Sequence, residues 1–406
     1  MDRTILHCDM NAFFASVELL ERPDLINVPM AVSGDPEGRH GIILAKNEIA
    51  KKYGVVTAET INQARKKCPD LVCVPPHHKK YSLISREINK IYSRYTDMVE
   101  PFSIDESWLD VTASRRLFGD GKTIADEIRH TVKKELGLTL SAGVSFNKIF
   151  AKMGSEYKKP DATTLITRDN YKDLLWPLPT VELFTCGKKA SEKLALSGIR
   201  TIGDLACADK ALIRALLGEN GAKLHEYANG EDTAPVALSY ERSKIKSLGH
   251  GITFSRDLEN EDDIRTAVTA LSDKVSARLR RHMMKAGGIK VEIKDPAFHV
   301  ISRQRQLPSP SDTAGTIRNA SLAIIKNEWK TGDPIRLITI TAINLVDESM
   351  PVQLDIFSST DPDADKHAQL DRAIDSIRGK YGDSSITFGK LIGNDIGIHI
   401  SYDEEY

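Results

Sequence analysis

The spacing of apolar residues along the first 165 positions switches repeatedly between two periods, and each switch predicts a new element. Alternation over residues 4–8 predicts a strand, and the helical spacing over 12–21 predicts a helix with Asp9 or Asn11 as its N-cap. The same patterns predict strands 30–33, 41–45 and 139–144, helices 48–53, 81–95, 121–136 and 147–156, and a hairpin of 99–104 with 107–111. This order predicts an α+β sheet with helices layered on one side.

The pattern becomes helical after Pro177, with short glycine-containing turns. Gly187, Gly198, Gly218 and Gly221 fit two tandem helix-hairpin-helix units, in which glycine lets backbone amides approach a phosphate. A small helical domain with glycine C-caps fits the same spacing. Residues 236–245 form a polar linker to a second, smaller α+β unit, predicted as strands 249–254, 288–294, 298–307 and 335–345 with helices 262–285 and 312–329. A helix over 366–381 and an alternating run over 396–400 complete the chain.

Length and composition place the chain among multidomain globular proteins. The 406 residues predict two to four domains, and 28% charged residues with dispersed Gly and Pro exclude a collagen-like or disordered chain. Five scattered cysteines without a CxxC argue against a disulfide framework or a zinc site and favour a reducing cytoplasm. Apolar stretches are far shorter than a membrane span, so we expect no membrane association.

Charge is unevenly distributed, although the whole chain carries a net charge of only −1. Residues 241–346 hold 18 Lys and Arg against 12 Asp and Glu, a net +6, whereas 347–406 hold 5 against 13, a net −8. A basic segment before an acidic tail indicates that one module binds a polyanion and the tail stays off it. Two differently solvated surfaces are the simpler alternative.

Three acids have the spacing expected of a cation site. Asp9 ends the first strand, and Asp105 with Glu106 occupies the tip of the predicted hairpin, where adjacent side chains need not point to opposite faces. If the first strand pairs with this hairpin, three carboxylates without His or Cys make a hard-oxygen site suited to Mg²⁺. A helix cap plus a solvated turn would explain the same residues without a metal.

The sequences around these acids resemble a known family. Residues 7–18 (HCDMNAFFASVE) and 103–111 (SIDESWLDV) are similar to the two acidic motifs of the Y-family, or translesion, DNA polymerases, closest to the polymerase IV class. The resemblance continues through 142–152 (AGVSFNKIFAK), 159–160 and 201–206, and covers about the first 350 residues.

The resemblance implies an α+β multidomain right-hand polymerase. It implies a ferredoxin-like palm over 1–19 and 76–165, small fingers over 20–75, and a helical thumb with helix-hairpin-helix units over 166–235. An α+β little finger over 246–346 would hold duplex DNA by backbone charge, followed by a tail over 347–406. The candidate phosphate contacts are Lys244, Lys246, Arg256, Lys290, Lys294, Arg303 and Arg305.

The implied chemistry is template-directed, magnesium-dependent nucleotidyl transfer with low fidelity and no proofreading. Asp9, Asp105, Glu106 and the backbone carbonyl of Met10 take the positions of ligands to two Mg²⁺ ions. Phe14 takes the position of the steric gate, because a flat side chain beneath the sugar leaves no room for a 2′-hydroxyl.

The implied triphosphate contacts include one departure from the family pattern. Lys159 lies at a triphosphate-contacting position, and the Pro that follows favours an extended backbone there. Residues 45–51 read AKNEIAK, so that Asn47 is present while Glu48 and Lys51 stand where the family shows Tyr and Arg. Because Lys is a point charge and Glu repels phosphate, we expect nucleotide affinity to be weaker and to rest on Lys51, Lys159 and Lys46.

Beyond the little finger, residues 353–357 (QLDIF) resemble the peptide by which bacterial polymerases bind the sliding clamp. Gln353 would make polar contacts, and Leu354, Ile356 and Phe357 would enter apolar pockets. The implied partners of a cytoplasmic monomer are therefore primer-template DNA, deoxynucleoside triphosphates and a clamp. Two alternatives are a nucleotidyl cyclase and a catalytically weakened DNA- and clamp-binding accessory protein derived from a polymerase V-like catalytic subunit.

Overall fold

The computed structural model describes residues 2–35, 41–241, 244–330, 332–350 and 364–398. Contacts divide the chain near residue 242 into two compact units, which are described separately. The predicted clamp peptide, with Gln353 and Phe357 near its ends, lies outside the described residues. Within the described ranges, no helix combines the length and apolar content that crossing a membrane requires.

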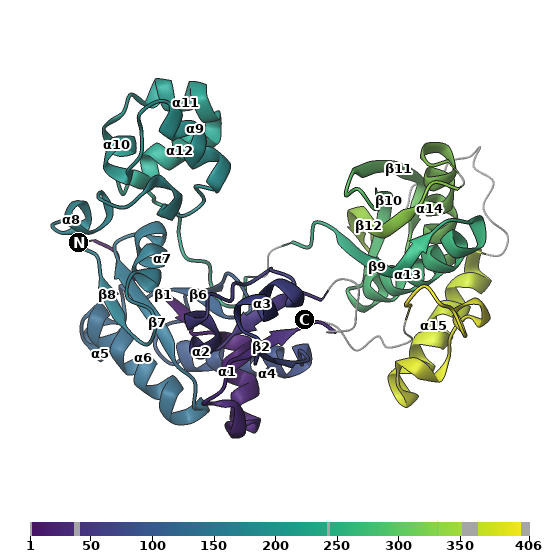
Figure 1. The fold of residues 1–406 in the computed structure, drawn as a ribbon, viewed down its shortest axis with the longest axis horizontal. Helices are drawn as coiled ribbons and strands as arrows, with labels where there is room; N and C mark the ends of the chain where they lie inside the picture. Colours follow the sequence, from purple (N-terminus) through teal and green to yellow (C-terminus); the bar gives the residue numbers. More distant parts are fainter. Residues whose placement is uncertain (1, 36–40, 242–243, 331, 351–363, 399–406) are drawn as a thin grey trace. The chain divides into compact units, whose positions relative to one another are not determined.

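The first unit is built on a mixed five-stranded sheet in the order β5-β6-β1-β7-β8 (Figure 1). Its central strand, β1, pairs antiparallel with both β6 and β7. The strands are β1 (Ile5–Met10), β5 (Val99–Pro101), β6 (Glu106–Asp110), β7 (Leu140–Ser145) and β8 (Thr163–Leu165). Every residue of β1 is buried, as expected for a central strand covered on both faces.

Helices cover both faces of this sheet, so the prediction of helices on one side is wrong: the central strand β1 is buried on both faces. On one face, α4 (His78–Tyr92) and α6 (Gly121–Leu136) bury Leu6, Cys8 and Met10 of β1. Because side chains alternate along a strand, His7 and Asp9 point to the other face, which is covered by α7 (Lys148–Tyr157). Figure 1 shows α6 and α7 on opposite sides of the sheet.

Helix α7 lies unusually close to the sheet because β7 contains Gly143. A Cβ added there would stand only 1.9 Å from the carbonyl oxygen of Ala151 and 2.4 Å from the amide nitrogen of Ser155. No side chain fits between the two backbones, so glycine is required for this approach. The polar residues on this face of α7 are thereby brought down onto His7 and Asp9.

A smaller three-stranded sheet, in the order β3-β2-β4, lies beside α1 (Phe13–Glu21). Its strands are β2 (Met30–Ser33), β3 (Ile43–Lys46) and β4 (Val72–Val74), and its helices are α2 (Glu48–Lys52) and α3 (Ile61–Lys67). Strand β4 and helix α3 were not predicted, because three-residue strands and a helix rich in Lys and Arg give little periodic signal. Elsewhere in this unit the short elements are η1 (Pro23–Leu25) and α5 (Arg115–Phe118).

Five short helices and one 3-10 turn follow, packed around their own apolar core. They are α8 (Tyr171–Leu175), η2 (Thr180–Glu182), α9 (Lys188–Leu196), α10 (Ile202–Cys207), α11 (Lys210–Leu217) and α12 (Glu219–Ala228). The helical character predicted after Pro177 is confirmed, and Thr201 forms a capping box with Asp204 at the start of α10. Gly218 adopts a φ of 67°, which glycine accommodates between α11 and α12.

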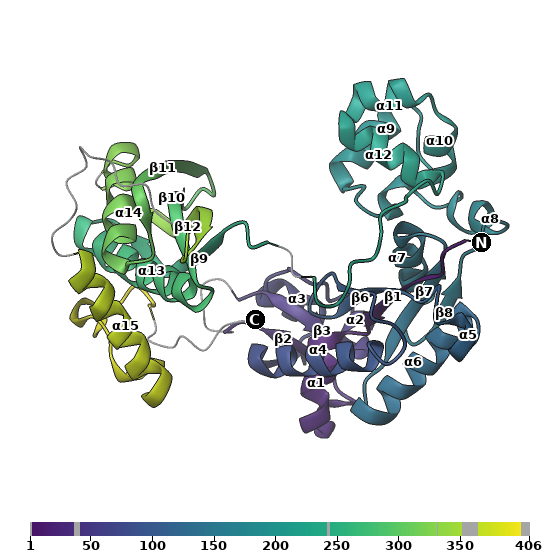
Figure 2. The same cartoon turned by 180° about the vertical axis from the view of Figure 1, so that it is seen from behind.

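The second unit is an antiparallel sheet, β11-β10-β12-β9, with α13 and α14 packed against it (Figure 2). The bounds are β9 (Leu248–Leu258), α13 (Glu261–Arg281), β10 (Met284–Lys294), β11 (Val300–Ser311), α14 (Ala314–Glu328) and β12 (Ile335–Asp347). All six predicted elements are present in the predicted order. The strands extend further than predicted because polar residues continue the ladder at their ends.

The chain after β12 does not remain separate from this unit. Helix α15 (Ala364–Tyr381) lies against α13, where Arg280 binds Asp375 at 2.5 Å and Arg378 binds Asp273 at 2.9 Å. Turns η3 (Asp383–Ser385) and η4 (Gly389–Leu391) follow, and Leu391, Ile396 and Ile398 are buried in the apolar core of the second unit. Apolar anchors and ion pairs therefore hold residues 364–398 on the second unit, and the helix predicted over 366–381 is present as α15.

One local prediction in the first unit is also wrong. Neither Asp9 nor Asn11 caps α1, because Ala12 occupies the N-cap position with a left-handed backbone and no side-chain hydrogen bond. Asp9 is inside β1, and the amide of Asn11 bonds to the hydroxyls of Thr139 and Ser141 across the sheet. Both polar side chains are thus kept at the sheet edge.

Candidate active site

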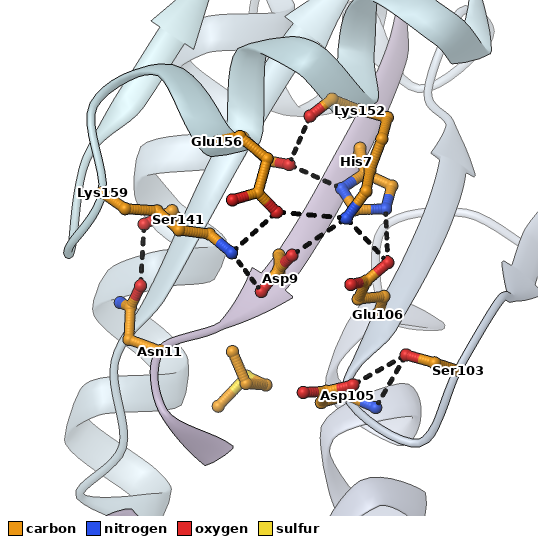
Figure 3. A network of polar contacts seen from close by, with 12 residues as sticks. His7, Asp9, Asn11, Ser103, Asp105, Glu106, Ser141, Lys152, Glu156 and Lys159 are labelled. Carbon is orange, nitrogen blue, oxygen red and sulfur yellow. Dashed lines mark hydrogen bonds and ion pairs between the residues drawn. The ribbon is translucent and has the colours of Figure 1, made fainter. Parts of the chain in front are cut away.

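Strand pairing brings Asp9 and Glu106 together from positions almost a hundred residues apart. They are direct partners in the β1–β6 ladder and point to the same face of the sheet. The Lys152 ammonium bridges them, at 3.2 Å from Asp9 Oδ2 and 2.9 Å from Glu106 Oε2 (Figure 3). Of the three carboxylates predicted to meet around a cation, Asp9 and Glu106 do lie together, with the Lys152 ammonium between them.

Asp105 lies beside this pair but its carboxylate points differently. It occupies the bend just before β6, and its carbonyl oxygen accepts a hydrogen bond from the amide of Met10 at 3.1 Å. Its carboxylate accepts a hydrogen bond from the Ser103 hydroxyl at 2.7 Å, away from Asp9 in Figure 3. The two acids of the predicted hairpin tip therefore lie in different elements: Asp105 is in the bend, and Glu106 is the first residue of β6.

Helix α7 adds a fourth carboxylate, Glu156, that the sequence reading did not single out. One carboxylate oxygen each from Asp9, Glu106 and Glu156 lies within 4.8 Å of the others. Glu156 also accepts hydrogen bonds from Lys152 at 3.2 Å and Lys159 at 2.9 Å. Lys152 and Glu156 are four residues apart and share one face of the predicted helix, so this signal was available in the sequence.

Burial and neighbouring charges separate the pKa values of these groups. Burial raises the pKa of Asp9 to about 7, although the ammonium groups of Lys159 and Lys152 act in the opposite direction. Burial also opposes ionisation of Glu106, but hydrogen bonds from His7 and Lys152 outweigh it and lower the pKa of Glu106 to about 2. Burial and the Glu106 charge raise the pKa of Asp105.

These residues fit a hard divalent cation. All the ligand atoms are carboxylate oxygens, the donors that Mg²⁺ prefers. Two ammonium groups already lie among the carboxylates, which shows that the positions favour positive charge. The acidic cluster is therefore a candidate metal site.

The acids face a cleft of about 360 Å³ that also contains the predicted gate and cationic residues. Phe14 lines this cleft and stacks on Tyr81, with ring centroids 4.2 Å apart and an interplanar angle of 15°. Phe13 is only 3% exposed and belongs to the sheet core, as predicted. Lys159 lies in the cleft wall, 2.8 Å from Asp9 Oδ1.

On the opposite wall, the unusual segment 45–51 contributes both signs of charge. Glu48 and Lys51 line the cleft as an exposed ion pair with an N–O distance of 3.6 Å. Lys46 donates to the Thr57 hydroxyl at 3.1 Å, and burial lowers the pKa of Lys46. The Glu48 charge is thus partly balanced within the protein.

The structure gives Asn47 a role other than the predicted nucleotide contact. Its side-chain oxygen accepts from the amides of Met30 and Ala50, at 3.1 and 2.9 Å. Its amide nitrogen donates to the Val28 carbonyl at 2.8 Å, and the residue is buried. Asn47 therefore caps α2 and ties it to β2, and its side chain is withdrawn from the cleft.

Comparison with known proteins assigns the chain that forms this cleft to a family. Residues 8–156 match the impB/mucB/samB family, and residues 245–356 match the C-terminal domain of that family. The DNA polymerase IV of Acetivibrio thermocellus is 43% identical over 393 residues, covering 97% of this chain and 98% of the relative. The chain belongs to the DNA polymerase IV family of Y-family DNA polymerases.

Other relatives agree with this assignment. DNA polymerase IV 1 of Bacillus subtilis is 37% identical over 397 residues, covering 96% of this chain and 93% of the relative. A solved chimera of the Y-family polymerases Dbh and Dpo4 superposes with a TM-score of 0.75 at 21% identity, covering 85% of this chain and 99% of the chimera. The expected Y-family fold is confirmed, as is the polymerase IV rather than the polymerase V group. The chain is accordingly a DNA-directed DNA polymerase of the translesion class, and not a cyclase.

Proposed function

We propose that this DNA polymerase IV extends primers by two-metal nucleotidyl transfer at the cleft formed by Asp9, Asp105, Glu106 and Phe14. The observation that carries the proposal is the convergence of Asp9 and Glu106 on one side of a cleft whose floor includes Phe14. Phosphoryl transfer to a primer hydroxyl requires acidic ligands for metal ions and a cation that contacts the triphosphate. The acids and Lys159 can supply these groups, and Phe14 lies beside them in the same cleft.

Asp9, Asp105, Glu106 and the carbonyl of Met10 would hold two Mg²⁺ ions. When bound, these ions would lower the pKa of the primer 3′-hydroxyl and stabilise charge on the leaving pyrophosphate. The protein keeps Glu106 ionised by means of His7 and Lys152, so this ligand needs no deprotonation before binding. Asp105 lines the same cleft and would exchange its hydrogen bond from the Ser103 hydroxyl for a cation.

Lys159, Lys51 and Lys46 would bind the triphosphate. Each lines the cleft wall, and none is an Arg, so none offers a planar, bidentate fork to phosphate oxygens. We propose weaker nucleotide affinity than an Arg-containing site would have, with unchanged chemistry.

Replacing Lys159 by Met should raise the KM for the incoming deoxynucleotide about 10-fold while lowering kcat much less, because a charge-assisted phosphate contact is worth about 1.5–3 kcal/mol. Steady-state insertion of one templated nucleotide measures both constants. Lys158→Met removes an exposed neighbouring charge and should leave them unchanged. Equal KM values in the two variants would remove Lys159 from the triphosphate site.

The second unit would hold duplex DNA through its basic residues. Lys244, Lys246, Lys290, Lys294, Arg303 and Arg305 remain candidates for phosphate contacts. Arg256 is withdrawn from this set because its guanidinium is bonded to Asp263 and Asp395, both at 2.7 Å. Contacts to the backbone alone tolerate any base sequence. Together with few fingers residues, they favour low fidelity, bypass of altered bases and synthesis without proofreading.

Residues 353–357 would attach the polymerase to a sliding clamp. Replacing Leu354 and Phe357 by Ala should abolish stimulation by the clamp, because apolar anchors dominate such peptide contacts. Primer extension without the clamp should stay within about 2-fold of the parent, because neither residue belongs to the proposed catalytic cleft. Extension assays with and without added clamp measure both effects. Undiminished stimulation in the double variant would contradict the peptide assignment.

Primer extension on normal and damaged templates tests the function as a whole. A monomeric protein acting in the bacterial cytoplasm should add templated deoxynucleotides with Mg²⁺ on both templates. Absence of any extension by the parent protein would instead favour an accessory role in DNA and clamp binding. This alternative is suggested by Glu48 and Lys51, which stand where the family shows Tyr and Arg.

A further inference from the structure

We propose that Lys152 is a fixed counter-ion that positions the carboxylates of Asp9 and Glu106, whereas Lys159 leaves them when a triphosphate binds. The inference rests on the proposed two-metal site and assigns different roles to two lysines that contact the same carboxylate. Lys152 is thus a positioning residue, and it acts through Asp9 and Glu106.

The first observation is where Lys152 lies. It approaches the carboxylates from α7, on the face of the sheet where that helix packs, and it does not line the cleft. Its side chain is 11% exposed and contacts three carboxylates, those of Asp9, Glu106 and Glu156. An incoming nucleotide in the cleft would meet the carboxylates first.

Lys159 differs in each respect. It lies in the cleft wall, its side chain is 26% exposed, and it follows α7 rather than forming part of it. It contacts Asp9 at 2.8 Å and Glu156 at 2.9 Å, without a contact to Glu106 within the salt-bridge distance. A small movement would take its ammonium group from Asp9 to a phosphate in the same cleft.

Close packing of α7 on the sheet restricts the position of Lys152. The Gly143 contact fixes the separation between α7 and the sheet, so the helix cannot withdraw without losing its packing. Buried His7 lies next to this contact, with Nδ1 2.8 Å from the Ser155 hydroxyl and Nε2 3.5 Å from Glu106 Oε2. His7 and Lys152 therefore hold the same carboxylate from two directions.

Charge balance explains why only one lysine should leave. With Asp9, Asp105, Glu106 and Glu156 ionised, four negative charges face two lysines. If Lys159 moves to the triphosphate and Lys152 stays, the protein presents a net charge of −3 to two divalent cations that carry +4. If both lysines left, four carboxylates would repel one another whenever the cations dissociate.

Metal-dependent thermal stability tests this without reference to catalysis. The comparison uses full-length parent, Lys152→Met, Lys152→Arg and the matched control Lys158→Met, each melted with EDTA or with Mg²⁺. Lys152→Met should melt lower than the parent in EDTA and regain more of its Tm with Mg²⁺, because the cation replaces the missing positive charge. Lys152→Arg and Lys158→Met should respond like the parent. A Lys152→Met response to Mg²⁺ equal to that of Lys158→Met would overturn the proposal.

Insertion kinetics separate positioning from triphosphate binding. Lys152→Met should lower kcat by about 10–100-fold, the usual cost of losing a group that orients metal ligands, with KM within about 3-fold of the parent. Lys159→Met should show the opposite split, and Lys152→Arg should recover most of kcat. A raised KM with little loss of kcat in Lys152→Met would overturn the division of roles.

Two further outcomes are distinguishable. If Lys152→Met does not fold, Lys152→Gln, which is uncharged but keeps a hydrogen-bond donor, takes its place in both assays with the same expected results. If the parent itself does not extend primers, the proposed function fails, while the melting experiment still decides whether Lys152 replaces a cation among these carboxylates.

Discussion

Primer extension should fall at least about 10³-fold when Asp105 or Glu106 is replaced by Ala, a loss of ~4 kcal/mol of transition-state stabilisation. Each change removes a proposed metal ligand. Glu106→Ala should have the further effect of leaving Lys152 and His7 without a shared acceptor. Single-turnover insertion with saturating Mg²⁺ and nucleotide measures the chemical step directly.

The matched control is Glu87→Ala, which removes an exposed carboxylate on α4 that forms an ion pair with Lys90 at 2.8 Å. Its insertion rate should stay within about 2-fold of the parent, as for most surface substitutions. DNA binding by all three variants should be retained, because the proposed phosphate contacts are basic residues of the second unit. Parental rates in Asp105→Ala would show that the turn acid takes no part in catalysis.

The second large effect concerns the sugar of the incoming nucleotide. Phe14→Ala should lower the preference for deoxynucleotides over ribonucleotides by about 10²–10³-fold, since the ring would no longer exclude a 2′-hydroxyl, and steric exclusion by a rigid side chain costs a few kcal/mol. The ring is held flat by Tyr81, whose hydroxyl donates to Glu18 at 2.5 Å. The ratio of kcat/KM for the paired deoxy and ribo substrates is the quantity to measure.

Phe13→Ala is the control for this prediction, because it removes an adjacent ring that faces the core. Its loss should reduce the free energy of unfolding by about 3–5 kcal/mol, the usual cost of truncating a buried Phe. Sugar preference in the folded fraction should not change. If Phe14→Ala keeps the parental sugar preference, the gate assignment is wrong, whatever the effect of Phe13→Ala.

The regular elements were predictable where periodicity was long. Helix 121–136 was predicted with its observed bounds, and the second unit was predicted element by element, because amphipathic helices and alternating strands of ten or more residues carry many consistent positions. Strands of three residues such as β4 and β8 carry too few positions to be distinguished from loops. The docking of α15 on α13 could not be predicted, because ion pairs such as Arg280–Asp375 join residues far apart in sequence.

The sequence predicted the acidic residues Asp9 and Glu106 of the candidate site better than it predicted the roles of the polar residues around them. Asp9 and Glu106 were found because strand ends and a hairpin place them on one edge. Asn47 was misassigned because the sequence does not distinguish an Asn that caps a helix in the interior from an Asn that contacts a nucleotide. Glu156 was missed although it shares a helical face with Lys152, because its importance arises only when Gly143 lets α7 approach β1 and β7.

The most direct test of the account is the position of the metal ions. Crystals of the full-length protein with primer-template DNA, a non-hydrolysable deoxynucleotide and Mn²⁺ would locate them by anomalous scattering. We expect two peaks, both bound by carboxylates from Asp9, Asp105 and Glu106, with Lys159 on the triphosphate and Lys152 still on Asp9 and Glu106. Peaks bound by other residues, or a nucleotide outside the cleft lined by Phe14, would contradict it.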